Sequence, residues 1–210
     1  MRAMKRRLGR PTQGDAAETR QRILDEARRA FTTRGYESTT NRDIALGAGI
    51  TAAAIYHYFP SKVDLYVAVF VSVQAKVFEA FEAAVASCGT FLEQLDAVFD
   101  VMCELAEHDP MLASFVVSVI TEASHHPELR KELAKLPPRQ EIFLSELCTK
   151  AKKRGELPES LPVQSAIDAM YGVLAGFSRL AVTVRDRERL LAAATVYKSM
   201  ARSALSRAGV

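Results

Sequence analysis

The chain has 210 residues, 49% of them apolar, and a formal net charge of +3. This composition can form a sizeable core and excludes a chain that is disordered throughout. The longest apolar run, near residues 115–120, is far too short to span a bilayer, so we expect no membrane partner.

Charge is distributed unevenly along the chain. Residues 1–70 carry 12 Lys and Arg against 7 Asp and Glu, whereas residues 71–210 carry 16 against 18. A basic front part and a mildly acidic back part predict that a polyanion meets only the front part.

The three cysteines, Cys88, Cys103 and Cys148, are odd in number and widely spaced, and no C-x-x-C pair occurs. They predict free thiols in a reducing compartment. No apolar segment follows the basic start, so we expect no signal peptide and a cytoplasmic location.

Residues 1–14 combine glycine and proline with five basic residues and show no hydrophobic period. This pattern predicts a disordered basic arm. An extended arm can follow phosphates or enter a minor groove, where arginine fits well. The arginines that we single out for such contacts are Arg6, Arg7 and Arg10. A tail that only improves solubility is the alternative interpretation.

The first predicted helix covers residues 15–34. Its apolar residues recur at helical spacing and form one stripe, and Gly35 is expected to end the helix as a C-cap. The residues of the stripe are Ile23, Leu24, Ala27, Ala30 and Phe31. This helix is expected to brace the motif that follows.

Two short helices joined by a tight turn are predicted between residues 40 and 59. Thr40 and Asp43 have the spacing of a capping box, and Thr51 can cap the second helix. Gly49 can adopt the left-handed conformation that a sharp corner requires. The inner side is filled by Ile44, Ala45, Ala48, Ile50 and Ile55. Two helices with a short, glycine-containing turn indicate a helix-turn-helix.

The outer face of the second short helix carries no formal charge apart from partial protonation of a histidine. It presents Ala52, Ala53, Tyr56, His57 and Tyr58. A face that meets only water more often carries Lys and Glu, so we expect this face to contact a partner. An ordinary helical hairpin with a solvated outer face is the alternative.

Ser61 and Asp64 repeat the capping pattern at the start of a fourth helix that continues to about Ser87. A helix of this length is too long to belong only to the small N-terminal unit, so we expect it to connect that unit to the rest. Lys62 lies at its start, where a cation could meet a phosphate.

The remaining chain keeps a period of 3.6 residues through five further helices. These helices are predicted to begin near Thr90, Pro110, Pro127, Pro162 and Arg185. Every proline falls at a helix start or in a break, and the seventh helix is interrupted at Pro137 and Pro138. The predicted fold is therefore all-α, with about nine helices and no strand.

These motifs resemble the signature of the TetR (tetracycline-repressor) family of transcriptional regulators. The resemblance lies in residues 38–45, 48–51 and 55–62 and covers residues 17–66 closely. It implies an all-helical homodimer with a helix-turn-helix DNA-binding domain, residues 15–62, and a C-terminal ligand-binding and dimerisation domain, residues 63–210. It further implies a repressor that a small effector, which we expect to be apolar or amphipathic, releases from a palindromic operator.

The resemblance also implies individual contacts with the DNA backbone. Thr40 and Arg42 match backbone-contacting positions at the start of the first of the two short helices. Lys62 matches a phosphate-binding lysine at the start of the fourth helix of the chain. In the family, the second of the two short helices is the recognition helix. Phosphate-contacting positions on and around it match Thr51, Tyr56 and Tyr58.

Two further positions, Ala53 and His57, match family positions near base edges. After the threonine cap the family often has Lys and Gly, whereas this chain has Ala52 and Ala53. Few side chains of this helix can therefore form hydrogen bonds to base edges, although alanine can contact a thymine methyl. We expect methyl contacts and DNA shape to carry much of the specificity.

Small residues at close spacing in the last two helices predict a close helix–helix contact, and two such pairs could form a four-helix bundle across a two-fold axis. The candidate dimer residues are Ile167, Tyr171, Leu174, Gly176, Ala194, Tyr197 and Ala201. Packing within one subunit is the alternative. Palindromic half-sites about 34 Å apart favour the dimer.

The fifth to seventh helices could enclose the effector pocket that the resemblance implies. The largely apolar candidates for its lining are Phe99, Met102, Cys103, Phe115 and Phe143. Ordinary core packing is the alternative for each of them.

No metal site, cofactor or catalytic constellation is predicted. His108, His125 and His126 lie near helix ends, and the adjacent pair points to different sides, so surface positions are expected. No nucleophile elbow, phosphate loop or zinc motif occurs, which argues against an enzyme. A helical protein-interaction module with incidental DNA binding remains the second hypothesis. A site bound about 10³-fold above random DNA would separate the two.

Overall fold

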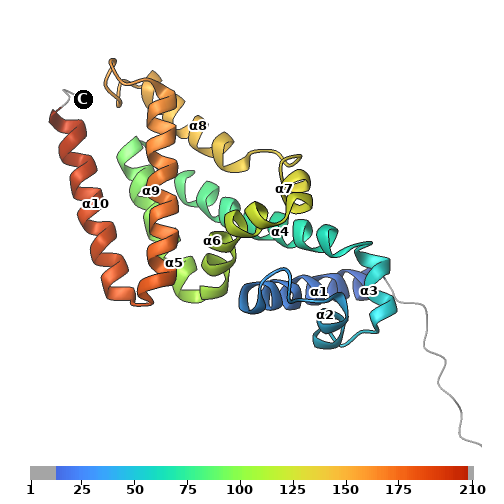
Figure 1. Ribbon diagram of the computed structural model, residues 1–210. Helices are drawn as coiled ribbons and strands as arrows, with labels where there is room; N and C mark the ends of the chain where they lie inside the picture. Colours follow the sequence, from blue (N-terminus) through green and yellow to red (C-terminus); the bar gives the residue numbers. More distant parts are fainter. Residues whose placement is uncertain (1–12, 208–210) are drawn as a thin grey trace, which may run out of the picture. The chain divides into compact units, whose positions relative to one another are not determined.

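The computed structural model describes residues 13–207, which form ten helices and no strand (Figure 1). This confirms the all-α prediction. The chain divides into two compact units between Val69 and Phe70, and each unit has a core of its own.

The first unit contains α1 (Gln13–Arg34), α2 (Asn41–Gly47), α3 (Ala52–Tyr58) and the first two turns of α4 (Lys62–Val85). The apolar stripe of α1 is buried as predicted, with Ile23 and Ala27 fully enclosed. Gly35 ends α1 with φ of 80°, and its N–H donates to the Phe31 carbonyl at 2.9 Å. A left-handed glycine at this position confirms the predicted C-cap.

Three aromatic rings hold the loop after α1 and the start of α4 together. Phe31, Tyr36 and Tyr66 contact one another with ring centroids 5.0 to 5.9 Å apart. The ring of Tyr66 and the side chain of Leu65 are fully buried. Aromatic pairs at this distance contribute beyond the area that they bury, so the first turns of α4 are firmly part of the first unit.

The second unit contains the rest of α4 and six further helices. These are α5 (Phe91–His108), α6 (Pro110–His125), α7 (Pro127–Leu133), α8 (Arg139–Lys153), α9 (Val163–Val184) and α10 (Arg187–Arg207). The helix that we expected to be interrupted at Pro137 and Pro138 consists of two helices, α7 and α8. The described residues therefore form ten helices instead of about nine, because two consecutive prolines lack the N–H groups that a continuing helix needs.

Two groups of aromatic rings form much of the second core. Phe78 and Phe81 of α4 meet Phe143 of α8 with centroids 5.7 to 5.8 Å apart. In the second group, Phe99 of α5 lies 4.9 Å from Phe177 of α9 and 5.0 Å from Tyr197 of α10. These contacts join α4 to α8 and α5 to the last two helices.

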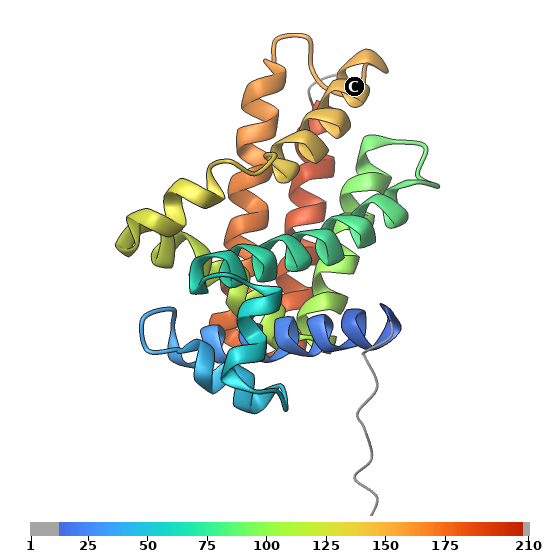
Figure 2. The ribbon, with the colours of Figure 1, turned by 90° about the vertical axis from the view of Figure 1, so that its right-hand side faces the viewer.

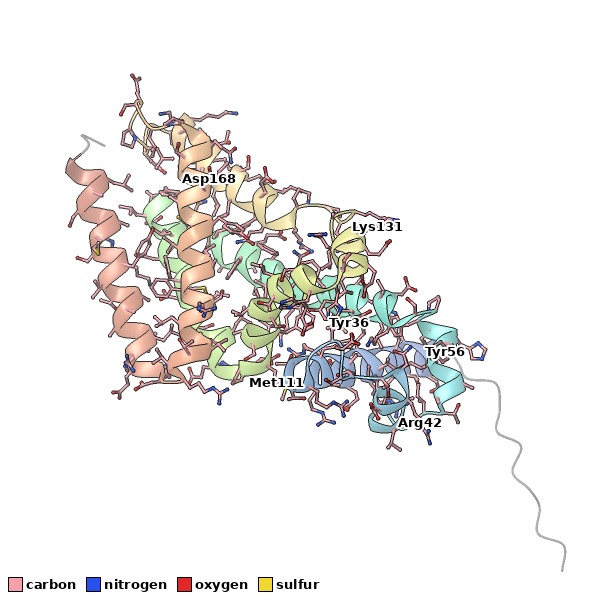
Figure 3. The ribbon with its side chains drawn as sticks, in the orientation of Figure 1. Tyr36, Arg42, Tyr56, Met111, Lys131 and Asp168 are labelled. Atoms are coloured by element: carbon pink, nitrogen blue, oxygen red, sulfur yellow. The ribbon has the colours of Figure 1, made fainter. Side chains whose placement is uncertain are left out.

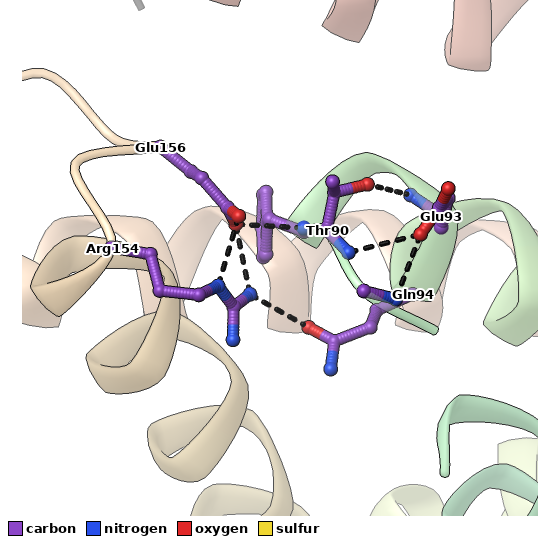
Figure 4. A network of polar contacts seen from close by, with 7 residues as sticks. Thr90, Glu93, Gln94, Arg154 and Glu156 are labelled. Atoms are coloured by element: carbon purple, nitrogen blue, oxygen red, sulfur yellow. Dashed lines mark hydrogen bonds and ion pairs between the residues drawn. The ribbon is translucent and has the colours of Figure 1, made fainter. Parts of the chain in front are cut away.

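A polar network fixes the start of α5 to the end of α8 (Figure 4). Thr90 and Glu93 form a capping box on α5. The N–H of Phe91 donates to the Glu156 carboxylate at 2.8 Å, and Arg154 pairs with the same carboxylate at 2.8 Å. These hydrogen bonds, chiefly those from Arg154, hold the pKa of Glu156 below its usual range.

The last two helices, α9 and α10, lie side by side in both views (Figures 1 and 2) and are joined by Arg185 in the left-handed conformation, with φ of 49°. By length and composition α9 could cross a membrane. Within the unit, 17% of its most apolar stretch is buried, so most of this stretch is exposed in the single chain. A soluble protein can contain such a helix when its exposed side meets another chain.

Candidate nucleic-acid interface and internal cavity

The start of α2 is fixed by the predicted capping box. The N–H of Asp43 donates to the Thr40 hydroxyl at 3.2 Å, while the Thr40 N–H and hydroxyl donate to the Asp43 carboxylate at 3.2 and 2.7 Å. The hydroxyl of Thr40, which the family resemblance assigns to DNA, is thus engaged in the cap. Its hydrogen bond, with the backbone bond, holds the pKa of Asp43 below its usual range.

The turn between α2 and α3 has the hydrogen bonds of a Schellman motif. The N–H of Ile50 donates to the Ala45 carbonyl at 2.9 Å, and the N–H of Gly49 donates to the Leu46 carbonyl at 3.2 Å. Gly49 has φ of 71°, which confirms the predicted left-handed corner. The sharp turn sets the direction in which α3 leaves α2.

Helix α3 is held by one buried side chain and exposes four of its seven residues to solvent. Thr51 caps it by accepting the N–H of Ala54 at 3.1 Å, and Ile55 is fully buried beneath it. Tyr58 is half-buried. The exposed residues of the helix are Ala52, Ala53, Tyr56 and His57. Tyr56, labelled in Figure 3, is 55% exposed. The structure therefore brings the predicted readout residues together on one uncharged, solvent-facing side.

Lys62 holds the start of α4 against the loop after α1. Its ammonium donates to the backbone carbonyls of Tyr36 at 3.0 Å and Glu37 at 3.4 Å, and it lies 4.2 Å from the centroid of the Tyr36 ring. The residue that we expected to meet a phosphate is thus engaged within the unit. We call these contacts the Lys62 latch.

One basic residue near α3 was not singled out from the sequence. The guanidinium carbon of Arg20, on α1, lies 5.3 Å from the centroid of Phe59, the C-cap of α3. Arg20 is exposed, whereas Phe59 is buried. The two residues are 39 positions apart, so no local pattern could have connected them.

The other predicted basic contacts are Arg42 and the three arginines of the N-terminal arm. Arg42 is exposed on α2, and within residues 13–207 its side chain has no ion-pair partner. Arg6, Arg7 and Arg10 lie outside the described residues.

The second unit encloses a cavity of about 440 Å³ between α4, α5, α6 and α9. Its lining includes Phe70, Val77 and Phe81 of α4, and apolar residues of α5, α6 and α9 complete the walls. A second cavity, of about 460 Å³, adjoins it and shares Gln74, Gln140 and Tyr171 with it. The first cavity is mostly apolar and has the volume of a typical small-molecule site.

Met102 alone among the five proposed pocket residues lines this cavity. Phe99 packs against Phe177 and Tyr197, and Phe143 packs against the α4 aromatic rings. Phe115 and Cys103 are buried in the core as well. The cavity is instead lined largely by α4, α6 and α9.

The seven candidate dimer residues separate into two groups. Ile167, Leu174 and Ala194 are buried in the subunit core, and Tyr197 and Ala201 pack against it. Tyr171 and Gly176 are exposed on α9. Two exposed apolar residues of α10 were missed, Val196 at 59% and Met200 at 63% exposure. Their positions could have been found only by knowing which side of α10 meets α5.

The three cysteines are free thiols, and within the described residues no group of three His, Cys, Asp or Glu is arranged to hold a metal ion. Burial raises the pKa of the Cys103 thiol and raises that of the Cys148 thiol to about 11. Such thiols are poor nucleophiles at neutral pH, because the thiolate is the reactive form.

Comparison with known proteins places both units in one family. The family model of bacterial regulatory proteins of the tetR family matches residues 23–69. The model of the tetracyclin repressor-like C-terminal domain matches residues 85–199, which is more than half of the chain.

Individual relatives agree with these family matches. The HTH-type transcriptional regulator TtgR of Pseudomonas putida is 30% identical over 197 residues, covering 87% of this chain and 89% of that protein. The regulator SrpR of Pseudomonas putida is 26% identical over 182 residues, covering 86% and 83%. The transcriptional regulator FadR of Bacillus subtilis, solved in complex with stearoyl-CoA, has the same fold with a TM-score of 0.74 at 24% identity, covering 86% and 96%. The chain therefore belongs to the TetR family of helix-turn-helix proteins, which bind DNA and regulate transcription.

Proposed function

We propose that this regulator is a cytoplasmic, dimeric repressor that releases a palindromic operator when a small apolar or amphipathic effector fills the 440 Å³ cavity. The observation that carries the proposal is the double role of α4. Its first turns bury Leu65, Tyr66 and Val69 in the first unit, and its later turns line the cavity through residues such as Val77. An effector that displaces the later turns therefore acts on the helix that holds the helix-turn-helix.

The exposed side of α3 is proposed to enter the major groove of DNA. Its alanine methyls can contact thymine methyls, and His57 can reach a base edge. Tyr56 and Thr51 can meet phosphates at the rim of the groove, together with Arg42 of α2 and Arg20 of α1. Because α3 carries no formally charged side chain, these arginines and the basic arm supply most of the attraction to phosphate.

The proposed dimer forms through the exposed sides of α9 and α10. A Cβ added at Gly172 or Gly176 would meet no atom within 4 Å, so both glycines leave open space along α9. On α10, Val196 and Met200 expose apolar side chains. A second copy that covers these surfaces would form a four-helix bundle. Two α3 helices could then reach half-sites about 34 Å apart.

The effector shifts the balance only by binding the DNA-free state more tightly. The mostly apolar walls of the cavity favour an apolar or amphipathic molecule. The stearoyl-CoA bound by the structurally similar FadR supports an acyl-chain ligand as one candidate class.

The DNA-binding part of the proposal is tested by selecting bound sequences from random duplexes. We expect a palindromic site bound about 10³-fold or more above random DNA at physiological salt, with T-rich positions under α3. Binding without such a ratio would contradict a regulator and favour a protein-interaction module.

The dimer is tested by placing a charge on the exposed side of α10. Met200→Glu should yield monomers in light scattering, because it places a charge in an apolar interface, and should weaken operator binding. Met111→Glu is the matched control, since Met111 is exposed at 36% on α6. A Met200→Glu protein that remains dimeric would contradict the proposed interface.

A further inference from the structure

The α4–α5–α6–α9 cavity has one charged residue among the described residues that line it, Arg179 of α9. The polar residues of the lining are otherwise neutral, and most of the wall is hydrocarbon. Arg179 is exposed in the single chain, so it lies at the edge of the cavity. A lone guanidinium in such a wall is the feature that most restricts the chemistry of an occupant.

Among the described residues of the second unit, Arg179, like Arg130, Arg185 and Arg189, has no ion pair, whereas four other arginines have acidic partners. Arg139 pairs with Glu82 at 3.4 Å, Arg187 pairs with Glu107 at 2.6 Å, and Arg154 and Arg202 have acidic partners as well. Within residues 13–207, the side chain of Arg179 has no such partner. Its positive charge is therefore available to a ligand.

A ligand whose head group lies beside this guanidinium replaces part of its hydration with its own atoms. A neutral apolar group would remove hydration without replacing its hydrogen bonds, and that exchange is unfavourable. A carboxylate would replace the lost hydrogen bonds with two charge-assisted ones, because the guanidinium fork matches its geometry. The hydrocarbon part of the same molecule would lie against the apolar walls of α4 and α6.

We propose that the effector class of this protein is a small anionic amphipath whose carboxylate pairs with Arg179 while its hydrocarbon chain fills the cavity. This inference rests on the proposed function, because it names the head group of the effector that the cavity would hold. The second cavity also contains an arginine, Arg139, but that guanidinium already has Glu82 as its partner.

The test uses three probes with the same ten-carbon chain and different head groups. Decanoate, 1-decanol and decyltrimethylammonium are titrated into the full-length protein by calorimetry, below their aggregation concentrations. We expect decanoate to bind at least 10-fold more tightly than decanol, with the ammonium probe weakest. Equal affinities for decanoate and decanol would overturn the inference, and this comparison needs no variant.

Variants then assign the preference to one residue. Arg179→Gln should weaken decanoate binding at least 10-fold and leave decanol within about twofold, whereas Arg179→Lys should retain part of the preference. Arg189→Gln is the matched control, since Arg189 is exposed on α10 and lines neither cavity. An Arg179→Gln protein that behaves like this control would overturn the assignment.

The outcomes separate this inference from the proposed function. In one outcome, decanol and decanoate bind equally and both release operator DNA. That result would support the effector cavity and refute the head-group inference. Failure of all three probes to bind would count against both. Circular dichroism and light scattering on each variant establish that a loss of binding comes from the head-group contact and not from unfolding or dissociation.

Discussion

The Lys62 latch leads to a prediction that separates a structural role from a DNA contact. Lys62→Met keeps a long apolar stem beside Tyr36 and removes the ammonium that donates to the carbonyls of Tyr36 and Glu37. The first unit should lose stability, because the start of α4 would lose the polar contacts with the loop that follows α1 and would keep only the ring contact of Tyr66 with Tyr36.

The expected loss follows from the geometry of the contacts. A hydrogen bond from a charged donor contributes about 1.5–3 kcal/mol, and a cation–π contact near the surface contributes about 0.5–1 kcal/mol. The bond to the Glu37 carbonyl, at 3.4 Å, is near the limit for a hydrogen bond, and Lys62 is only half-buried. We therefore expect the free energy of unfolding to fall by about 2 kcal/mol.

Urea unfolding followed by circular dichroism measures this loss. Lys76→Met is the control, because Lys76 pairs with Asp109 at 2.9 Å with its own side chain 53% exposed. Such surface pairs contribute about 0–1 kcal/mol. If Lys62→Met costs no more than this control, the latch does not stabilise the unit and our reading of its geometry is refuted.

The salt dependence of DNA binding distinguishes the two roles of Lys62. A lost phosphate contact would reduce the slope of log affinity against log salt by about 0.9. Loss of the latch alone would lower the affinity at every salt concentration and leave the slope unchanged. We expect the unchanged slope.

Three further predictions concern single residues. Gly49→Ala should cost about 1–2 kcal/mol because φ is 71°, whereas Gly49→Asn should cost less; equal losses in urea unfolding would contradict this strain. At pH 8 a thiol reagent should label the half-buried Cys88 in the native protein and leave Cys148, with its pKa of about 11, unlabelled until unfolding, and rapid native labelling of Cys148 would contradict its burial. Because hydrogen bonds lower the folded pKa of Asp43, its contribution should be complete above the unfolded pKa, about 3.9, and should be lost as pH falls through the lower folded value. The difference in stability between wild type and Asp43→Asn, measured from pH 2 to 7, should follow that course, and a difference that grows toward low pH would contradict it.

The sequence by itself determined the local features of the helix-turn-helix. Thr40 with Asp43, and Gly49 at the corner, lie within a few residues of the groups with which they interact. Caps and turns depend on such short-range contacts, so their spacing along the chain is enough to predict them. The burial of Ile55 followed in the same way from the apolar pattern around the turn.

Only the tertiary structure decided what each buried or charged side chain contacts. The sequence made Phe99 and Phe143 candidates for the pocket lining, with core packing as the alternative. It could not show that other rings fill the space around them while α4, α6 and α9 leave a cavity. The ammonium of Lys62 likewise donates to carbonyls of residues that are 25 and 26 positions away in the sequence. Periodicity fixes which side of a helix avoids water, whereas the identity of the neighbour on that side depends on how separate helices pack in space.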